Sequence, residues 1–426
     1  MSYQDYPKLS ERVFRRVLPN GLTVIVVLRP GFQGKSAYFA TNFGSIHRDF
    51  ILEGERYRVP AGIAHFLEHK MFDLPDRDVS AEMAALGAYV NAFTRYDRPA
   101  YHFSCTDHFQ ESLDLLLDFV STPYFTEESV QKEWGIIDQE IGMNADSPDT
   151  IVFEMLTEGM YRYHDVRTPI LGTSESIRQI TPELLHLCHR AFYTPANMVL
   201  CVMGDVDPEQ VVASAEKWLG TELRPVGQKI PTTPEEMTCP ESHRQTTMEI
   251  AMPTFQLAFK CEAVGTGKES VHREVAWNLA AEALFGESSP LYQELYEKGI
   301  IDNSFGGCFE TLADCAFLTC GGDSNDPEAV RSALLTHARR LVAEGISQEE
   351  FLRMKRSALG RRIRGLDNFD STCFRLCAYH FDQYDYFLFP ENYEDVTVCE
   401  IQDCLDRVVR EERCVLSVIY PVKEEP

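Results

Sequence analysis

Stretches of apolar residues, separated by polar and proline-containing segments, predict a series of strands and helices along this chain of 426 residues. Residues 18–27 place β-forming residues on both sides of Asn20-Gly21, which predicts a β-hairpin with a type I′ turn. Residues 62–72 combine apolar and helix-forming residues without an interior proline, which predicts a helix. The order of such elements along the chain therefore indicates the fold class.

Further strands and helices follow in both halves of the chain. Strands are predicted at 255–260 and 415–420, and helices near 108–121, 126–144, 270–285, 327–343, 347–365 and 370–382. A polar, proline-rich stretch at 225–236 is typical of a linker. We therefore expect an α+β protein with two homologous domains, 1–224 and 246–426, joined by a linker at 225–245. Each domain is expected to be a mainly antiparallel sheet covered by helices on one face.

The segment from His65 to His69 contains two histidines and a glutamate at positions that suit a metal site. On a helix, His65 and His69 are four residues apart and share one face, so both imidazoles can reach one ion. Glu68 lies on nearly the same face and could act as a general base on a water molecule. This is the H-x-x-E-H arrangement of inverzincins, although two histidines on the surface of an ordinary helix would give the same short pattern.

A hydrolytic zinc site usually has three protein ligands, so a third ligand is expected elsewhere in the chain. Glu133 and Glu140 are seven residues apart on a predicted helix, which puts them on one face two turns apart. By spacing alone either carboxylate could face the metal, and a pair of solvated helix charges would look the same.

These motifs together resemble the pitrilysin or insulinase family of zinc peptidases, and most closely its half-length bacterial members of the YmfH type. The resemblance implies that Zn²⁺ is bound by His65, His69 and Glu140, that Glu68 is the catalytic base, and that Glu133 orients a ligand histidine. It covers most of the amino-terminal half, including the closing strand and turn at 197–208. Residues 1–224 are therefore expected to form the catalytic zinc-binding domain.

The resemblance also identifies residues 87–94 as the family's edge strand, beside which a peptide substrate binds as one more strand. Asn91, Ala92 and Phe93 are then expected to contact the substrate, and main-chain bonding would make binding tolerant of peptide sequence. In a purely structural interpretation, Asn91 is only a strand-end residue.

The second half departs from the family pattern, because it lacks H-x-x-E-H and an arginine–tyrosine pair that many members use to hold the substrate carbonyl. Tyr296 stands in the place of the arginine, and Asp302 or Asn303 in the place of the tyrosine. We therefore expect a degenerate second domain. Half-length family members often work as pairs in which one subunit carries zinc and the other carries the Arg/Tyr pair, so the resemblance implies a heterodimer with a half-length paralogue that supplies this pair. A homodimer or monomer that uses other donors is the alternative.

Composition narrows the partners and the compartment. With 66 acidic and 40 basic residues, the formal net charge is −26, which argues against a nucleic-acid surface. Thirteen scattered cysteines without C-x-x-C are expected to be free thiols, many of them packed as small apolar residues. No signal peptide or membrane-length apolar run is recognised, so we expect a soluble, cytoplasmic protein.

Together these features predict a zinc metalloendopeptidase that cleaves short or unfolded peptides, with Glu68 as general base. Two other hypotheses remain open. One is a non-catalytic assembly subunit, against which the intact Glu68 argues. The other is a maturation factor associated with aminopentanol modification of elongation factor P, because relatives of this type are named for that association.

Overall fold

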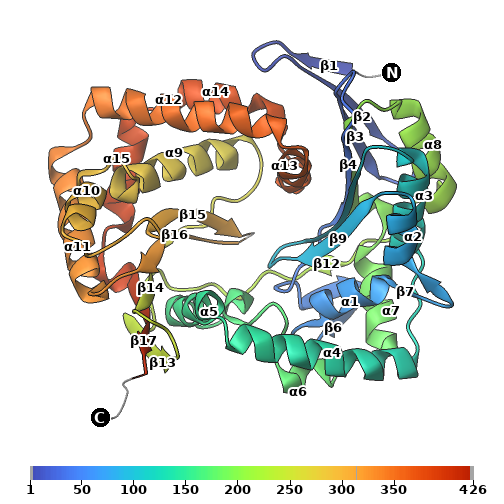
Figure 1. The fold of residues 1–426 in the computed structure, drawn as a ribbon, viewed down its shortest axis with the longest axis horizontal. Coiled ribbons are helices and arrows are strands. Elements are labelled where there is room, and N and C mark those ends of the chain that lie inside the picture. Colours follow the sequence, from blue (N-terminus) through green and yellow to red (C-terminus); the bar gives the residue numbers. More distant parts are fainter. Residues whose placement is uncertain (1–2, 313, 423–426) are drawn as a thin grey trace. The chain divides into compact units, whose positions relative to one another are not determined.

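The computed structural model describes residues 3–312 and 314–422 and divides into two compact units, each built on a β-sheet (Figure 1). Among the described residues, unit 1 comprises 3–141, 169–231 and 363–388, and unit 2 comprises the remainder. The units are thus discontinuous along the chain, whereas the domains predicted at 1–224 and 246–426 are continuous segments. The domain boundaries at 1–224 and 246–426 therefore stay a prediction, namely that the chain consists of two related halves.

The sheet of unit 1 has seven strands in the order β1-β2-β3-β11-β4-β10-β9. All neighbours are antiparallel except β11 and β3, so the sheet is mainly antiparallel, as the sequence predicts. Its strands are β1 (Tyr3–Tyr6), β2 (Glu11–Val17), β3 (Thr23–Leu28), β4 (Lys35–Thr41), β9 (Tyr89–Thr94), β10 (Pro99–Cys105) and β11 (Met198–Gly204). β9 lies at one edge of this sheet, in agreement with the prediction for residues 87–94.

The predicted hairpin is present, but the prediction of a type I′ turn is wrong. Strands β2 and β3 pair antiparallel and are joined by residues 18–22, where the Gly21 amide donates to the Leu18 carbonyl at 2.9 Å. A type I′ turn needs a positive φ at both central residues. Gly21 has a φ of +87°, but Asn20 does not have a positive φ. The Asn20 side chain instead accepts a hydrogen bond from the Leu22 amide at 3.0 Å and stabilises a wider loop.

Helices of unit 1 cover one face of its sheet and enclose the main hydrophobic core. Leu113, Leu116 and Phe119 of one such helix pack with Phe39 and Val202 of the sheet. The helices of this unit are α1 (Ile63–Met71), α2 (Val79–Ala85), α3 (Phe109–Ser121), α4 (Glu127–Ala145), α6 (Ser174–Ile177), α7 (Pro182–Phe192), α8 (Pro208–Leu219) and α13 (Phe369–Phe381). From Gly142 onward, the last residues of α4 belong to unit 2. Small ribbons are formed by β5 (Asp49–Leu52), β6 (Glu55–Arg58) and β12 (Gln228–Lys229), and by β7 (Asp73–Leu74) and β8 (Arg77–Asp78).

The sheet of unit 2 has five strands in the order β13-β17-β14-β16-β15, again with one parallel pair, β13 and β17. Its strands are β13 (His243–Met248), β14 (Thr254–Cys261), β15 (Gly306–Leu312), β16 (Cys315–Asp323) and β17 (Cys414–Pro421). Its helices are α5 (Pro148–Met160), α9 (Lys268–Phe285), α10 (Pro290–Glu297), α11 (Pro327–Glu344), α12 (Gln348–Arg364), α14 (Phe389–Asp395) and α15 (Val398–Val408). The helices predicted in this half are confirmed to within a few residues. β13 begins inside the segment predicted as the linker.

Each sheet also carries a helix on its other face, which comes from a distant part of the chain. In unit 1, α13 packs on β4 and β11, and its Asp370 accepts a hydrogen bond from Ser36 at 2.8 Å. In unit 2, α5 packs on β14 and β17, and Lys260 donates to the Met160 carbonyl at 2.8 Å. The sequence analysis predicted helices on one face of each sheet only. The spacing of apolar residues along a helix shows which side of the helix is buried, but not which sheet it packs on.

All thirteen cysteines are free, and nine of them are buried, which confirms the expectation of small apolar core residues. Among the residues that the structure describes, no helix combines the length and apolar character needed to cross a membrane.

Candidate metal centre

The helix α1 begins at a glycine that no other residue replaces easily. Gly62 precedes the helix with a φ of +87°, and a Cβ built there would lie 2.4 Å from the Leu171 carbonyl oxygen. A positive φ and a close backbone approach both favour glycine. Eight of the nine residues of α1 are buried, and only His69 is partly exposed. The helix that carries the H-x-x-E-H motif is therefore held rigidly inside unit 1.

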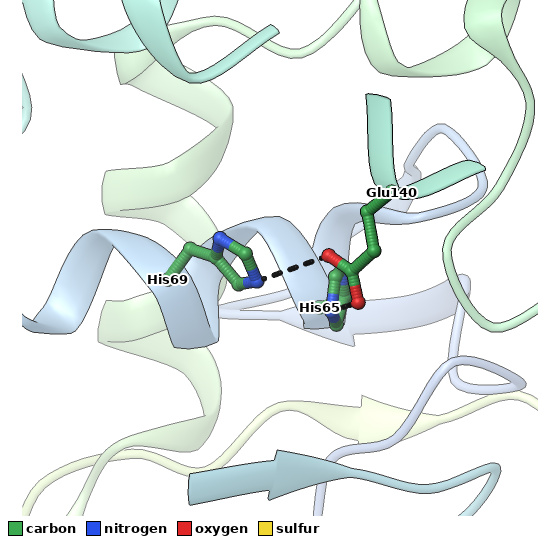
Figure 2. A group of neighbouring side chains, drawn as sticks. All are labelled: His65, His69 and Glu140. Carbon is green, nitrogen blue, oxygen red and sulfur yellow. Dashed lines mark ion pairs between the residues drawn. The ribbon is translucent and has the colours of Figure 1, made fainter. Parts of the chain in front are cut away.

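His65, His69 and Glu140 are brought together by α1 and α4 (Figure 2). The Nε2 atom of His65 lies 3.6 Å from Oε1 of Glu140, and the Nε2 atom of His69 lies 3.5 Å from Oε2. One candidate ligand atom from each of the three residues lies within 4.8 Å of the others. Both imidazoles thus present the same nitrogen to one carboxylate.

These separations fit a bound zinc ion better than direct hydrogen bonds. Zinc–nitrogen and zinc–oxygen bonds of about 2.0–2.2 Å in a tetrahedral site place ligand atoms about 3.3–3.6 Å apart. Hydrogen bonds between nitrogen and oxygen are shorter, at about 2.7–3.2 Å. Two imidazoles and one carboxylate are also the donor set of known catalytic zinc sites. The residues present therefore fit the metal that the sequence predicts.

The protonation of His65 also suits a ligand. Its burial, followed by the nearby His69, lowers the pKa of His65 to about 3. The imidazole is therefore neutral at physiological pH and keeps a lone pair for a metal. Its Nδ1 atom is buried and makes no hydrogen bond within the part of the chain that the structure describes.

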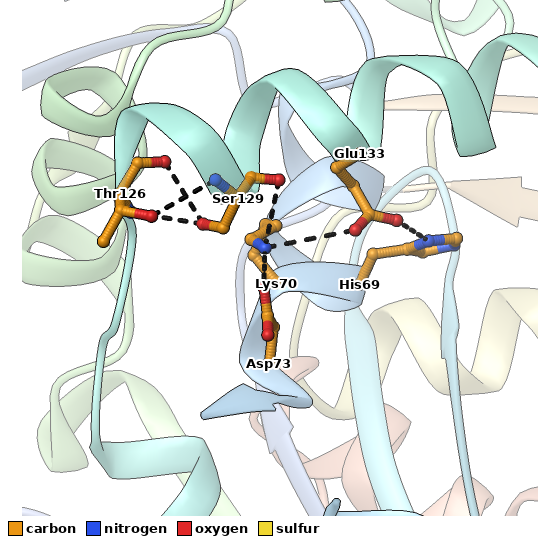
Figure 3. Close-up of polar contacts among 6 residues, drawn as sticks. All are labelled: His69, Lys70, Asp73, Thr126, Ser129 and Glu133. Carbon is orange, nitrogen blue, oxygen red and sulfur yellow. Dashed lines mark hydrogen bonds and ion pairs between the residues drawn. The ribbon is translucent and has the colours of Figure 1, made fainter. Parts of the chain in front are cut away.

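His69, in contrast, is oriented by a carboxylate. Its Nδ1 atom lies 2.9 Å from Oε1 of Glu133 (Figure 3), whereas its other ring nitrogen, Nε2, faces Glu140. Burial disfavours the imidazolium, but the hydrogen bond to Glu133 and the charges of Glu133, Glu68 and Glu140 together raise the pKa of His69. Glu133 thus lies where the sequence prediction places the residue that orients a ligand histidine.

Glu68 is a buried carboxyl next to the three candidate ligands. Its side chain accepts a hydrogen bond from the Thr94 hydroxyl at 2.6 Å, which joins α1 to the edge strand β9. Burial raises the pKa of Glu68, while Thr94 and His69 oppose the shift and Glu140 adds to it. A carboxylate with increased proton affinity is suited to accept a proton from water.

The three residues predicted to contact substrate lie on β9. Phe93 points to the face covered by α13, where its ring lies 5.7 Å from Phe374 and 6.0 Å from His102. Asn91 is exposed, and its side chain accepts a hydrogen bond from the Ala92 amide at 2.9 Å. Their contact with a peptide stays a prediction.

Sequence reasoning missed two residues that contact the site. Side chains alternate between the two faces of a strand, so Thr94 lies on the same face as Ala92 and opposite to Phe93. The sequence could have shown this, but nothing in it indicated the contact of Thr94 with Glu68. Lys70 is fully buried behind His69, although lysine is usually exposed.

Comparison with known proteins shows which family the chain resembles. The family model "Insulinase (Peptidase family M16)" matches residues 50–174, and "Peptidase M16 inactive domain" matches residues 179–358. A Bacillus subtilis (strain 168) protein described as an uncharacterized zinc protease, YmfH, is 36% identical over 98% of each chain. An uncharacterized zinc protease of Mycobacterium leprae is 29% identical over 86% of this chain and 82% of its own.

Solved structures show the same fold. The crystal structure of a protein described as an M16-like peptidase from Alicyclobacillus acidocaldarius has a TM-score of 0.93 and 32% identity, over 97% of this chain and 99% of that chain. A protease from Helicobacter pylori has a TM-score of 0.80 at 20% identity, covering 96% of this chain and 100% of that chain, and shows the fold alone.

Proposed function

The chain belongs to the insulinase family, peptidase family M16, and from this premise we propose that it is a zinc-dependent endopeptidase acting on short or unfolded peptides. The observation that carries the proposal is the convergence of both Nε2 atoms on Glu140 beside the buried carboxyl of Glu68. The description of relatives as zinc proteases supports zinc as the metal.

In this proposal His65, His69 and Glu140 hold the metal. Bound zinc supplies Lewis-acid activation of a water molecule and of the scissile carbonyl. Glu68 accepts the proton of the attacking water and returns it to the leaving amine. Thr94 holds one oxygen of Glu68, so the carboxylate keeps one orientation during both transfers.

Substitution of Glu68 by glutamine is the direct test. The amide keeps the shape of the side chain but cannot accept the proton, so hydrolysis should fall by about 10²–10⁴-fold while zinc content is retained. The matched control is Glu128→Gln on the exposed start of α4, which should hydrolyse peptides at the wild-type rate. Turnover of a zinc-loaded Glu68→Gln protein at the wild-type rate would remove Glu68 as the base.

We further propose that the substrate adds as a strand along the free edge of β9, next to Asn91, Ala92 and Phe93. The edge position of β9 and its link to Glu68 through Thr94 support this. Main-chain hydrogen bonds would then carry most of the binding. In a series of peptides, each N-methylated at a different single amide, cleavage should be lost at alternate positions. Only every second amide of a strand faces one neighbouring strand. Equal tolerance of all positions would argue against strand addition.

We also propose a heterodimer with a half-length paralogue that supplies the arginine and tyrosine missing here. Tyr296 lies in α10 and is 51% exposed, and Asp302 and Asn303 lie in the exposed loop that follows. None of these side chains can act as a guanidinium donor. Loss of one carbonyl-stabilising donor costs about 10²–10³ in rate, so the isolated chain should be a weak peptidase.

The heterodimer is tested by adding such a paralogue, one that lacks H-x-x-E-H but keeps the Arg/Tyr pair. We expect complex formation and a gain in hydrolysis that is lost when the paralogue's arginine is substituted. Strong hydrolysis by the isolated chain, unchanged by the paralogue, would contradict the proposal.

A further inference from the structure

A buried lysine lies directly behind the candidate metal centre. Lys70 follows His69 in the last turn of α1, and its side chain has an exposed fraction of 0%. An ammonium group without solvent needs polar partners, because burying an unpaired charge is strongly unfavourable. The partners of Lys70 therefore indicate why the residue is tolerated there.

The ammonium of Lys70 has three partners, which Figure 3 shows around its Nζ atom. It donates to the carboxylate of Asp73, just after α1, and to the Ser129 carbonyl oxygen in the first turns of α4 at 3.4 Å. It also lies 4.0 Å from Oε2 of Glu133. Lys70 thus connects α1 with α4, the two helices that bring the candidate ligands together.

The two oxygens of Glu133 have different partners. Oε1 lies 2.9 Å from Nδ1 of His69, and Oε2 faces the ammonium of Lys70. The carboxylate is buried, with 12% of its side chain exposed, so solvent does little to fix its orientation or to balance its charge. The carboxylate of Glu133 therefore lies between the ammonium of Lys70 and the imidazole of His69.

We propose that Lys70 is a positioning residue for the metal centre, which holds Glu133 so that His69 presents Nε2 toward Glu140. The inference rests on the metal centre of the proposed function. When Glu133 accepts a proton from Nδ1 of His69, the lone pair of this imidazole is on Nε2, the atom 3.5 Å from Glu140. Lys70 contacts neither the ligand atoms nor Glu68 in this role.

A structural role of Lys70 would have a different consequence. If its pairing with Asp73 only anchored the end of α1, removal of the charge would lower stability and leave metal affinity unchanged. If it acts through Glu133, metal affinity should fall, and the effect should disappear once Glu133 cannot serve as an acceptor. Metal affinity can be measured without any peptide, so the result does not depend on catalysis.

The experiment uses the full chain, freed of metal, and measures zinc affinity by competition with a chromogenic chelator. Lys70→Met should weaken zinc binding about 10–100-fold, the range found when residues behind metal ligands are changed. The control Lys132→Met removes an exposed lysine next to Glu133 and should leave zinc affinity unchanged. In the double variant that combines Lys70→Met with Glu133→Gln, the loss of zinc affinity should be no greater than in Glu133→Gln alone.

A cobalt-loaded sample gives a second readout. The visible absorption of bound Co²⁺ reports on its ligands, so Lys70→Met should change this spectrum as Glu133→Gln does. Wild-type zinc affinity and an unchanged cobalt spectrum in Lys70→Met would overturn the proposal, as would additive losses in the double variant. If Lys70→Met does not fold, Lys70→Gln, which can still donate to Ser129, tests the same prediction. Absence of peptide hydrolysis in every sample would contradict the proposed function but not this inference.

Discussion

The two units share one strand topology, and the candidate metal centre lies in unit 1. Strands β3-β11-β4-β10-β9 of unit 1 and β13-β17-β14-β16-β15 of unit 2 have the same order, the same single parallel pair and the same sequence of connections. In both, two helices lie between the second and third of these strands along the chain: α1 and α2 in unit 1, and α9 and α10 in unit 2. By this order α1 corresponds to α9. The correspondence supports the predicted duplication.

The equivalent helices differ in what they bury. α1 has nine residues and buries His65 and Glu68 among apolar neighbours. α9 has eighteen residues and buries mainly apolar ones, and its Trp277 stacks on Phe309 of β15 with ring centroids 5.4 Å apart. The same position in the fold can therefore hold either a metal-binding helix or an ordinary core helix. The topology provides the position, and the side chains decide its chemistry.

The largest expected effect concerns Glu140, the proposed carboxylate ligand in unit 1. Glu140→Gln removes the charge of a proposed zinc ligand, so zinc should be lost on dialysis and hydrolysis should fall by more than about 100-fold. Glu269→Gln, on the exposed start of α9, should change neither metal content nor hydrolysis. Metal analysis after dialysis checks both. Stoichiometric zinc in Glu140→Gln would remove Glu140 as a ligand.

The next effect tests the helix that packs on the second face of the unit 2 sheet. A Cβ at Gly159 of α5 would lie 2.8 Å from Cγ1 of Val415 in β17, so Gly159→Leu should overpack this contact. Overpacking typically costs about 1–3 kcal/mol. Hydrogen exchange should show the loss in β14 and β17 and leave the strands of unit 1 protected. Equal deprotection of both sheets would show that the units do not unfold separately.

A pH effect on stability is expected from the ion pair of a buried histidine in unit 2. Burial opposes the charge of His164, but hydrogen bonds to Asp314 and Cys315 raise the pKa of His164 to about 10. Burial likewise opposes the charge of Asp314, but the bond from His164, with Nε2 and Oδ1 2.6 Å apart, lowers the pKa of Asp314. Because the histidine has a lower pKa when unfolded, about 6.5, its contribution is complete below that pH and is lost as the pH rises toward 10.

His164→Gln should remove this pH dependence, and should cost about 1–3 kcal/mol at pH 6, where the charged hydrogen bond is intact. Chemical unfolding at pH 6 and pH 9.5 measures both. The variant should lose less stability than the wild type between these two values. An identical loss in both proteins would show that the pair does not contribute.

The smallest effect concerns the strands that unit 1 has in excess. Arg16 of β2 forms a bidentate pair with Glu209 of α8, at 3.0 and 2.7 Å, and the five-stranded sheet of unit 2 has no strands equivalent to β1 and β2. Both side chains are about one-third exposed. Glu209→Gln should therefore cost only about 0.2–1 kcal/mol in unfolding experiments and less at high salt. If the free energy of unfolding falls by more than that, the contact of β2 with α8 contributes more to the stability of unit 1 than an ordinary surface ion pair.

The sequence determined the local features of the protein. The spacing of His65, Glu68 and His69 on a helix and the helices in both halves follow from residues close together in the chain, whereas the edge strand at 87–94 is predicted from the family resemblance. Helical periodicity also placed Glu133 and Glu140 on one face of α4. Short-range patterns are sufficient here because a helix or strand fixes which of its residues share a face.

Only the tertiary structure decided the long-range contacts. It showed that Glu140 faces the Nε2 atoms of both histidines while Glu133 contacts Nδ1 of His69, which their equal periodicity could not distinguish. It also revealed the contact of Thr94 with Glu68 and the burial of Lys70 between α1 and α4. Such contacts depend on how two segments distant in the chain approach each other, and the spacing of residues within one segment contains no information about that approach.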